Sequence, residues 1–493
     1  MNILEQFEKV VKTQADNIAV CDENEQLSFN ELKDKALSLA SSLSFCANKN
    51  QAIGIFIDRS IYSIVAMIAT LYSGNYYVPL DPKMPTHKLK SIVEETTMPA
   101  ILVHDNCLDD INYSGEVINI RTDYKNKLNY DLSNFDDNNP LYMVYTSGST
   151  GKPKGVLKSH KAMSSFMNTY ATKYHFDDKT IIGNQSPFFF DAAAKDLYMM
   201  MLVGAKMVII PTILFSMPYK LIEYLNDYQV NFISWVPSML SMIVQLNTFD
   251  DITPKYLKRV FFVGESFPIK HLNKWLTQLP SIEYVNLFGS SEVAGVFATY
   301  EVKKIKENQN FLPIGKALDN CKVLLVNDDG IVDKANELGE IVISSDAVAL
   351  CYYKDEAKTK EKFIETDKYT GKKERFFITG DIASYDEDGN IVFVTRKDFQ
   401  IKKMGYRIEL GEIEAIANKY DPMKMCCATY NQEKKKISLF CEVSDPEITK
   451  NDIKNYLKDN LPDYMMPDKF KILDKLPLNA NGKIDRAYLK SLA

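Results

Sequence analysis

The alternation of apolar and polar positions divides the chain into two regions. Between about residues 50 and 345, short β-rich apolar runs alternate with segments of helical period, which is typical of parallel sheets flanked by helices. The pattern predicts one helix at 60–73 and strands at 53–58, 76–80, 100–104, 233–235, 260–263 and 284–287. Several of these strands end at Gly or polar residues. Ligands of open α/β sheets lie beyond the carboxyl ends of strands, so we expect the site there.

A different pattern begins after about residue 395. Residues 413–420 carry one apolar helix face, residues 425–443 form two strands around a charged turn, and residues 450–460 form an amphipathic helix. This is the pattern of a small α+β domain. We therefore predict a large α/β N-terminal domain of layered sheets flanked by helices at 1–395 and a small α+β C-terminal domain at 401–493, with a boundary near residues 396–398.

Composition and charge exclude several classes of function. The 493 residues are 46% hydrophobic and 25% charged, as in a globular enzyme, and the net charge of -6 attracts no phosphate backbone. We expect no nucleic-acid partner. The first twenty residues mix charges without an apolar core, and no apolar run reaches the roughly 20 residues that span a bilayer. We expect a cytoplasmic protein without membrane insertion, whose eight cysteines are buried reduced thiols.

The stretch at 141–155, LYMVYTSGSTGKPKG, carries the most chemical information. An apolar strand leads directly into a loop of hydroxyls, glycines and two lysines, Lys152 and Lys154. Backbone N–H groups, hydroxyls and ammonium groups together suit phosphate oxygens. A kinase-type P-loop needs GxxxxGK followed by Ser or Thr, and here Pro153 follows Lys152. The loop therefore predicts a phosphate site of another kind.

The loop YTSGSTGKPKG resembles the phosphate loop of the acyl-adenylate-forming family, which includes nonribosomal peptide synthetase adenylation domains, D-alanine–carrier protein ligases, acyl-CoA synthetases and luciferases. Similar stretches follow the family order over nearly all of the chain. They are LSFNEL at 27–32, LYSGNYYVPLD at 71–81, FFFDAAAKDLY at 188–198, NLFGSSE at 286–292, GEIVIS at 339–344, FITGD at 377–381, RKDFQIKKMGYRIELGEIE at 396–414, LPDYMMP at 461–467 and NGKIDR at 481–486. The C-terminal stretches resemble the amino-acid-activating branch.

The resemblance implies an ATP site. The implied ATP-binding residues are Thr146, Ser147, Gly148, Ser149, Thr150, Gly151, Lys152, Asn286, Leu287, Phe288, Gly289, Ser290, Ser291, Asp381, Phe393, Arg396 and Lys483. Asn286 would face the adenine amino group, Phe288 would stack on the ring, and Asp381 would accept hydrogen bonds from the ribose with help from Arg396. Glu292 would hold Mg²⁺ against the phosphates.

The resemblance also implies a catalytic lysine and a moving domain. Lys483 would bridge the substrate carboxylate and the α-phosphate, stabilising charge that develops during the attack. Asp398 matches the hinge of the family, expected here at 396–400, about which the mobile C-terminal domain rotates to admit a thiol.

Asp191 follows three phenylalanines, and its counterpart in the amino-acid branch binds the substrate α-ammonium. Lys195 lies one helical turn on, where it would either pair with Asp191 or line the side-chain pocket beside Val263 and Gly295. A pocket lysine suits an acidic amino acid, whereas Val263, Gly295 and the segment 196–198 resemble ligases for alanine. Both substrates stay open.

The expected activity is that of a ligase that forms a carbon–sulfur bond through an acyl-adenylate. The chain ends soon after NGKIDR, so we expect the acyl acceptor to be the phosphopantetheine arm of a separate carrier protein. An acyl-CoA synthetase that uses free CoA is the first alternative. A luciferase-like oxygenase is a remote one, because one fold hosts several chemistries.

Overall fold

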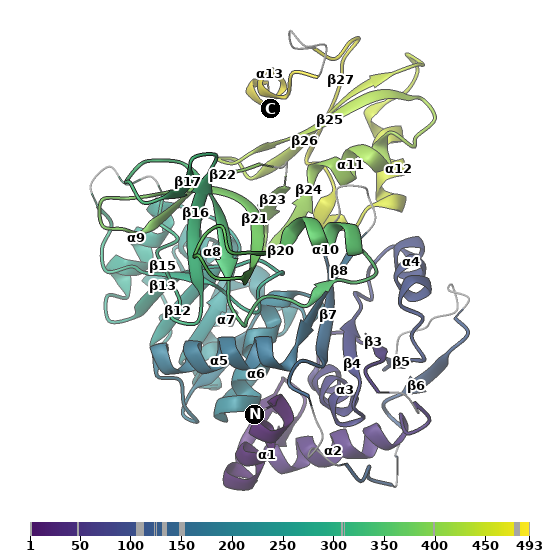
Figure 1. The fold of residues 1–493 in the computed structure, drawn as a ribbon, viewed down its shortest axis with the longest axis vertical. Helices are drawn as coiled ribbons and strands as arrows, with labels where there is room; N and C mark the ends of the chain where they lie inside the picture. The colour runs from purple at the N-terminus through teal and green to yellow at the C-terminus, as the bar shows by residue number, and fades with distance from the viewer. Residues whose placement is uncertain are drawn as a thin grey trace. The chain divides into compact units, whose positions relative to one another are not determined.

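The computed structural model describes residues 2–46, 49–104, 113–122, 124, 126–130, 136–146, 153–306, 309, 311–397, 400–477 and 484–492. The chain forms two compact units (Figure 1). The larger unit comprises Met1–Pro82, Val93–Val144 and Gly155–Lys397, and the smaller unit comprises Lys83–Ile92, Tyr145–Lys154 and Asp398–Ala493.

A nine-stranded sheet is the widest element of the larger unit. Its strand order is β15-β14-β13-β12-β11-β9-β10-β1-β2, and the five pairings from β13 to β1 are parallel. The strands are β1 (Ile18–Cys21), β2 (Gln26–Ser28), β9 (Ile181–Asn184), β10 (Lys206–Ile209), β11 (Phe232–Trp235), β12 (Arg259–Val263), β13 (Glu283–Phe288), β14 (Ala298–Glu301) and β15 (Lys316–Ala317). The predicted strands at 233–235, 260–263 and 284–287 are confirmed.

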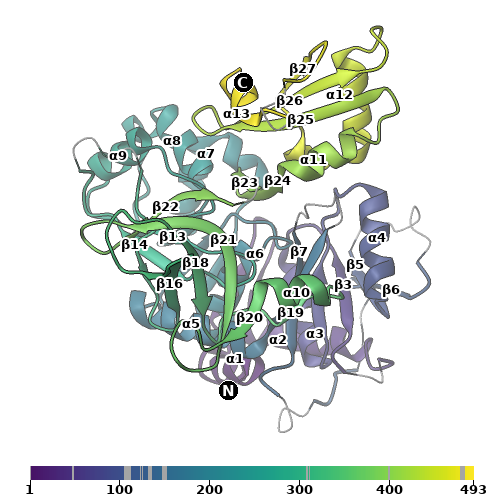
Figure 2. The ribbon, with the colours of Figure 1, turned by 45° about the horizontal axis from the view of Figure 1, so that its top comes forward.

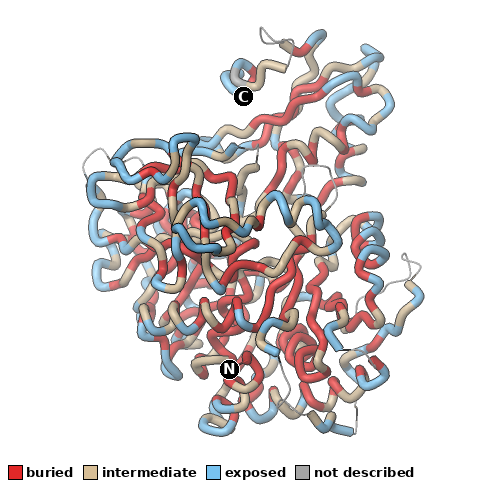
Figure 3. Tube along the Cα trace, viewed as in Figure 1, coloured by how far each residue is buried: buried red, intermediate tan, exposed pale blue. Residues whose placement is uncertain are grey.

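A second sheet, of seven strands, has the order β19-β8-β7-β4-β3-β5-β6. Its strands are β3 (Ala52–Phe56), β4 (Tyr76–Pro79), β5 (Ala100–Val103), β6 (Glu116–Asn119), β7 (Pro140–Thr146), β8 (Lys154–Ser159) and β19 (Cys351–Tyr352). The central strands β3, β4 and β5 are parallel and entirely buried, which explains their continuous apolar sequences (Figure 3).

The third sheet differs from the sequence prediction. Residues 316–345 were predicted as part of a parallel α/β pattern, but β16 and β18 belong to an antiparallel sheet of order β17-β16-β18-β21-β20, with β22 beside β21. Only a tight turn at 328–329 separates β16 from β17, and it contains no helix that would make a parallel crossover. The strands are β16 (Lys322–Asn327), β17 (Gly330–Val332), β18 (Gly339–Ser344), β20 (Phe363–Thr366), β21 (Glu374–Tyr385) and β22 (Ile391–Arg396).

Helices pack against the sheets and against one another. They are α1 (Ile3–Gln14), α2 (Phe29–Ser41), α3 (Ile61–Tyr72), α5 (His160–Tyr174), α6 (Asp191–Val203), α7 (Pro218–Asp227), α8 (Pro237–Gln245), α9 (Ile269–Gln278) and α10 (Glu356–Lys362), while α4 (Thr86–Thr96) runs from one unit into the other. The predicted helix at 60–73 is α3, which Ser60 and Ser73 cap. Helices α5 and α6 lie side by side, and α6 also packs against α1 (Figure 1).

The smaller unit, whose helices and strands are labelled in Figure 2, has its own hydrophobic core. Its elements are β23 (Gln400–Lys403), β24 (Tyr406–Glu409), α11 (Leu410–Ala417), β25 (Met423–Asn431), β26 (Lys436–Val443), α12 (Lys450–Asn460), β27 (Lys469–Ile472) and α13 (Arg486–Ser491). The predicted hairpin and amphipathic helix are therefore present as β25, β26 and α12.

Two remaining expectations concern membranes and cysteines. No helix in the described ranges is long and apolar enough to cross a bilayer. Six of the seven described cysteines are buried free thiols, whereas Cys351 is only half-buried. Burial raises the pKa of the Cys21 and Cys321 thiols to about 11.

Candidate active site

The pair Asp381–Arg396 stands on neighbouring strands of the third sheet. The two residues lie directly opposite each other on β21 and β22, and Arg396 donates to Oδ1 of Asp381 at 2.5 Å and to the Thr379 carbonyl at 3.1 Å. Asp381 is buried. A guanidinium fixed in this way holds the carboxylate in one orientation, as a ribose-binding acceptor requires.

An aromatic surface joins this pair to the nine-stranded sheet. The ring of Phe393 on β22 lies 5.7 Å from the ring of Phe288 at the carboxyl end of β13. On the same strand, Asn286 donates its amide N–H to the Pro313 carbonyl at 2.8 Å. That contact leaves the Asn286 side-chain oxygen as the acceptor, which is what an adenine amino group needs.

Glu292 and Ser290 follow β13 at the end where phosphates are expected. Glu292 is 1% exposed, and its Oε1 accepts a hydrogen bond from the Tyr352 hydroxyl at 2.9 Å. The buried Ser290 hydroxyl has no hydrogen-bond partner among the described residues. A carboxylate next to an unsatisfied hydroxyl fits Mg²⁺, which takes one or two protein carboxylates and completes its shell with phosphate and water oxygens.

Thr146 is the last residue of β7 and belongs to the smaller unit, which begins again at Tyr145. Its buried hydroxyl likewise has no partner in the described part of the chain. Lys154, which we expected to supply charge to the phosphates, instead pairs with Glu409 of the same unit at 2.8 Å. The other predicted residues of the loop, the hinge residue and the catalytic lysine lie outside the described residues: Ser147, Gly148, Ser149, Thr150, Gly151, Lys152, Asp398 and Lys483.

Asp191 is the first residue of α6, where the helix dipole stabilises a carboxylate. Its Oδ1 accepts hydrogen bonds from Lys158 Nζ at 2.5 Å and from the Tyr142 hydroxyl at 2.7 Å. Sequence reasoning missed Lys158. The available signal was a lysine within the apolar strand segment 154–159, where a cation needs a buried partner.

Lys195 does not pair with Asp191 as the helical spacing had allowed. Its side chain is 3% exposed, donates to the Ala192 carbonyl at 2.9 Å and lies 3.8 Å from Asp196. Burial raises the pKa of Asp196, and the Lys195 ammonium opposes that shift. A role of Lys195 in the side-chain pocket stays a prediction.

The backbone at Gly295, a predicted pocket residue, adopts a conformation that requires glycine. Gly295 has φ +68°, and a Cβ there would meet the Phe166 ring at 2.2 Å. A Cβ on Gly289 would meet the Gly295 carbonyl at 2.5 Å. Val263 lies at the carboxyl end of β12 and is half-buried. Leu287 is buried and Ser291 is half-buried.

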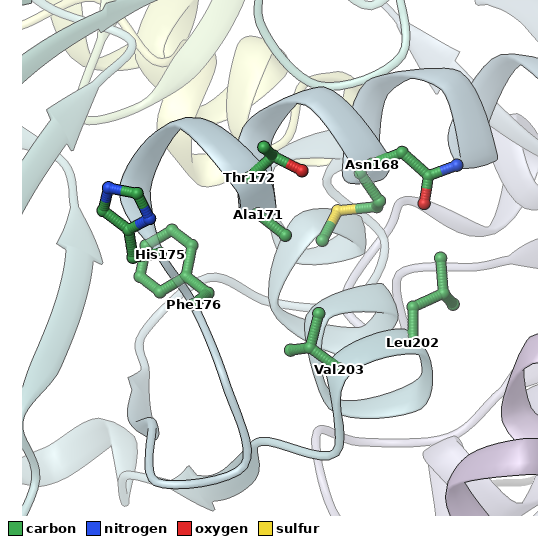
Figure 4. Close-up of a pocket in the computed structure, with 8 residues that line it drawn as sticks. Asn168, Ala171, Thr172, His175, Phe176, Leu202 and Val203 are labelled. Carbon is green, nitrogen blue, oxygen red and sulfur yellow. The ribbon is translucent and has the colours of Figure 1, made fainter.

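One pocket of the larger unit lies elsewhere. It measures about 390 Å³ and lies between α5 and the end of α6 (Figure 4). Its lining includes Asn168, Thr172, His175 and Val203 and contains none of the predicted site residues. The contacts of Asp381 with Arg396 and of Phe288 with Phe393, rather than this pocket, therefore mark the candidate active site.

Comparison with known families decides what this constellation is. Residues 7–353 match the family described as AMP-binding enzyme, and residues 412–483 match the AMP-binding enzyme C-terminal domain. The chain belongs to the AMP-binding enzyme family. It is an adenylate-forming ligase that binds ATP, and its two family segments correspond to a large N-terminal α/β domain and a small C-terminal domain.

Several relatives of this AMP-binding enzyme are bacterial synthases. Zwittermicin A synthase ZmaJ of Bacillus cereus is 32% identical, over 99% of this chain and 94% of that protein. Tyrocidine synthase 3 of Brevibacillus parabrevis is 31% identical over 96% of this chain. This chain spans only 7% of that synthase and 44% of tyrocidine synthase 1 of the same organism.

Solved structures share the fold. The adenylation domain AlmE of Vibrio cholerae, solved with glycyl-adenosine-5'-phosphate, superposes with a TM-score of 0.84 at 18% identity, over 99% of this chain and 97% of that chain. The o-succinylbenzoate CoA synthetase MenE of Bacillus subtilis gives a TM-score of 0.86 at 20% identity, over 99% of this chain and 98% of that chain.

Proposed function

We propose that this enzyme adenylates an amino acid with ATP and transfers the aminoacyl group to the phosphopantetheine arm of a carrier protein. One observation carries the proposal. Two parts of the chain that are far apart in the sequence, β13 and the neighbouring strands β21 and β22, bring an amide, an aromatic surface and an ion-paired carboxylate together in one unit. The contacts are those of Phe288 with Phe393 and of Asp381 with Arg396. These groups match the adenine and the ribose of an adenylate.

In the proposed reaction, a carboxylate oxygen of the acid attacks the α-phosphorus of ATP and pyrophosphate leaves. Glu292 would hold Mg²⁺, which when bound neutralises phosphate charge. The buried hydroxyls of Ser290 and Thr146, which have no partner among the described residues, are donors for phosphate oxygens. Lys483 would stabilise the charge that develops at the reacting groups, and the C-terminal domain would turn about Asp398 between adenylation and thioester formation.

Relatives support the amino acid and the carrier. AlmE was solved with a glycyl adenylate, and a protein described as an NRPS protein containing adenylation and PCP domains superposes with a TM-score of 0.87 at 23% identity. The similarity to MenE, a CoA synthetase, keeps free CoA as the competing acceptor. The fold is common to both kinds of acceptor, so the acceptor has to be measured.

Acid-dependent exchange of labelled pyrophosphate into ATP tests the first half-reaction across proteinogenic, β- and aryl amino acids, D-alanine and fatty acids. Exchange with at least one acid is the expected result, and silence across the panel contradicts the proposal. The second half-reaction is tested by mass spectrometry with a phosphopantetheinylated carrier and, separately, with CoA. A thioester on CoA alone identifies the enzyme as an acyl-CoA synthetase.

A further inference from the structure

The Lys158–Asp191 pair is unusual because the cation is entirely inside the protein. The Lys158 side chain is 0% exposed, whereas that of Asp191 is 14% exposed. Lysine is almost never fully buried without a partner, because removing an ammonium group from water is costly. Nζ lies 2.5 Å from Asp191 and 5.2 Å from the centre of the Tyr142 ring. Lys158 is thus a permanent counter-ion of Asp191, unlike a mobile surface lysine.

Among the other described residues, none places a second carboxylate directly beside Asp191. Tyr142 donates to the same oxygen that Lys158 contacts, and the hydroxyls of Tyr77 and Tyr198 hydrogen-bond with each other at 2.7 Å nearby. Glu292 faces Lys158 more distantly and is the expected Mg²⁺ ligand. Among the described residues, no donor contacts the second oxygen of Asp191, Oδ2, which is therefore the one that a ligand can reach.

We infer that this site accepts carboxylic acids whose α carbon carries no ammonium group, because Lys158 already supplies the cation that Asp191 holds. Among amino acids, this class comprises those with the amino group on the β or a later carbon, or on an aromatic ring. The inference rests on the proposed function and narrows its substrate.

Two kinds of ligand group can donate to Oδ2 of Asp191, an α-ammonium and a neutral hydroxyl, and Lys158 affects them differently. An α-ammonium would share one negative charge with Lys158 and would feel the repulsion of a like charge about 5 Å away, which at an effective dielectric constant of about 20 lowers its affinity on the order of 10²-fold. A neutral hydroxyl donates to Oδ2 without that repulsion. The Lys158–Asp191 pair therefore disfavours the α-ammonium specifically.

The test uses two ligands that differ only in the α substituent: glycyl- and glycolyl-sulfamoyl adenosine, which mimic the adenylates of glycine and of its hydroxy analogue. Isothermal titration calorimetry on the wild-type enzyme should show that the glycolyl compound binds at least about 10-fold tighter. Equal affinity, or tighter binding of the glycyl compound, overturns the inference. Pyrophosphate exchange with the acid panel keeps the two failures distinguishable: exchange supported only by α-amino acids overturns the inference and leaves the adenylation proposed above standing, whereas silence across the panel contradicts the adenylation itself.

The variant Lys158→Met tests whether Lys158 causes the preference for the glycolyl compound. Lys158→Met removes the internal cation and should shift the affinity ratio toward the glycyl compound on the order of 10²-fold. Tyr142→Phe is the matched control, because it removes a neutral donor from the same Asp191 oxygen and should leave the ratio unchanged. A ratio that is the same in Lys158→Met and in wild type contradicts the inference. The wild-type comparison decides the question even if Lys158→Met does not fold.

Discussion

Replacing Asp191 by Asn tests how strongly the buried ammonium of Lys158 depends on its carboxylate. The substitution keeps the shape of the side chain and removes its charge. Lys158 is 0% exposed, so solvent cannot replace the lost partner. Removing one member of a buried ion pair typically costs about 3–5 kcal/mol of folding free energy. We expect Asp191→Asn to lose stability in this range at pH 7.

The cost of deprotonating Lys158 gives a similar value for the stability lost in Asp191→Asn. The unpaired amine can shed its proton, and holding a lysine of ordinary pKa, about 10.4, in the neutral form at pH 7 costs about 4.6 kcal/mol, at about 1.36 kcal/mol per pKa unit. Burial lowers the pKa of Lys158, and Asp191 opposes that shift. Without Asp191 the pKa of Lys158 falls further, and deprotonation sets the upper limit of the loss.

The sign of the pH dependence follows from proton binding. Between the lowered pKa of Lys158 in the folded state and its ordinary value in the unfolded chain, the unfolded chain binds more protons, so stability rises with pH. The window is wider in Asp191→Asn than in wild type. The stability deficit of the variant should therefore shrink between pH 7 and pH 9.5, by at most about 3.4 kcal/mol, which is about 1.36 kcal/mol for each of the 2.5 pH units.

The assay is urea unfolding followed by tryptophan fluorescence at both pH values. The chain has two tryptophans, Trp235 and Trp275, and both are buried in the larger unit that contains Asp191. Tyr142→Phe is the control: it should cost about 1.5–3 kcal/mol, as a hydrogen bond to a charged group does, equally at both pH values. A deficit in Asp191→Asn below about 1 kcal/mol, or one independent of pH, refutes the reasoning.

Three further predictions concern the active site. Lys483→Ala should lower pyrophosphate exchange on the order of 10²-fold with a smaller effect on thioester formation from preformed adenylate, and equal loss in both half-reactions would contradict its role. Asp381→Asn removes the charged partner of Arg396 and should raise the KM for ATP about 10- to 100-fold, the equivalent of about 1.5–3 kcal/mol; an unchanged KM would place the ribose elsewhere. Gly295→Ala requires a left-handed backbone at φ +68° and a Cβ 2.2 Å from the Phe166 ring, so it should cost about 1–3 kcal/mol in urea unfolding, and a neutral result would mean that this loop rearranges freely.

The periodicity of apolar residues correctly predicted individual helices and strands, which depend on local sequence. The helix α3 and the strands β11, β12 and β13 appear where the apolar runs placed them, because a buried parallel strand is apolar on both faces. The antiparallel third sheet was missed. Some of its pairings join residues that are distant in the sequence, such as Val323 with Ile343 and Ile343 with Phe377, and a local pattern does not report such partners.

The amino-acid sequence by itself determined the family, because ordered motifs identify it, and it predicted the residues of the nucleotide site. Only the tertiary structure decided which charges neutralise each other. Helical spacing pointed from Asp191 to Lys195, one turn on, yet Lys195 bonds back to Ala192 and lies near Asp196. Lys158, on a strand 33 residues earlier, reaches Asp191 instead. An ion pair depends on how close and how deeply buried the two charged groups are in the folded chain, and the local order of residues determines neither.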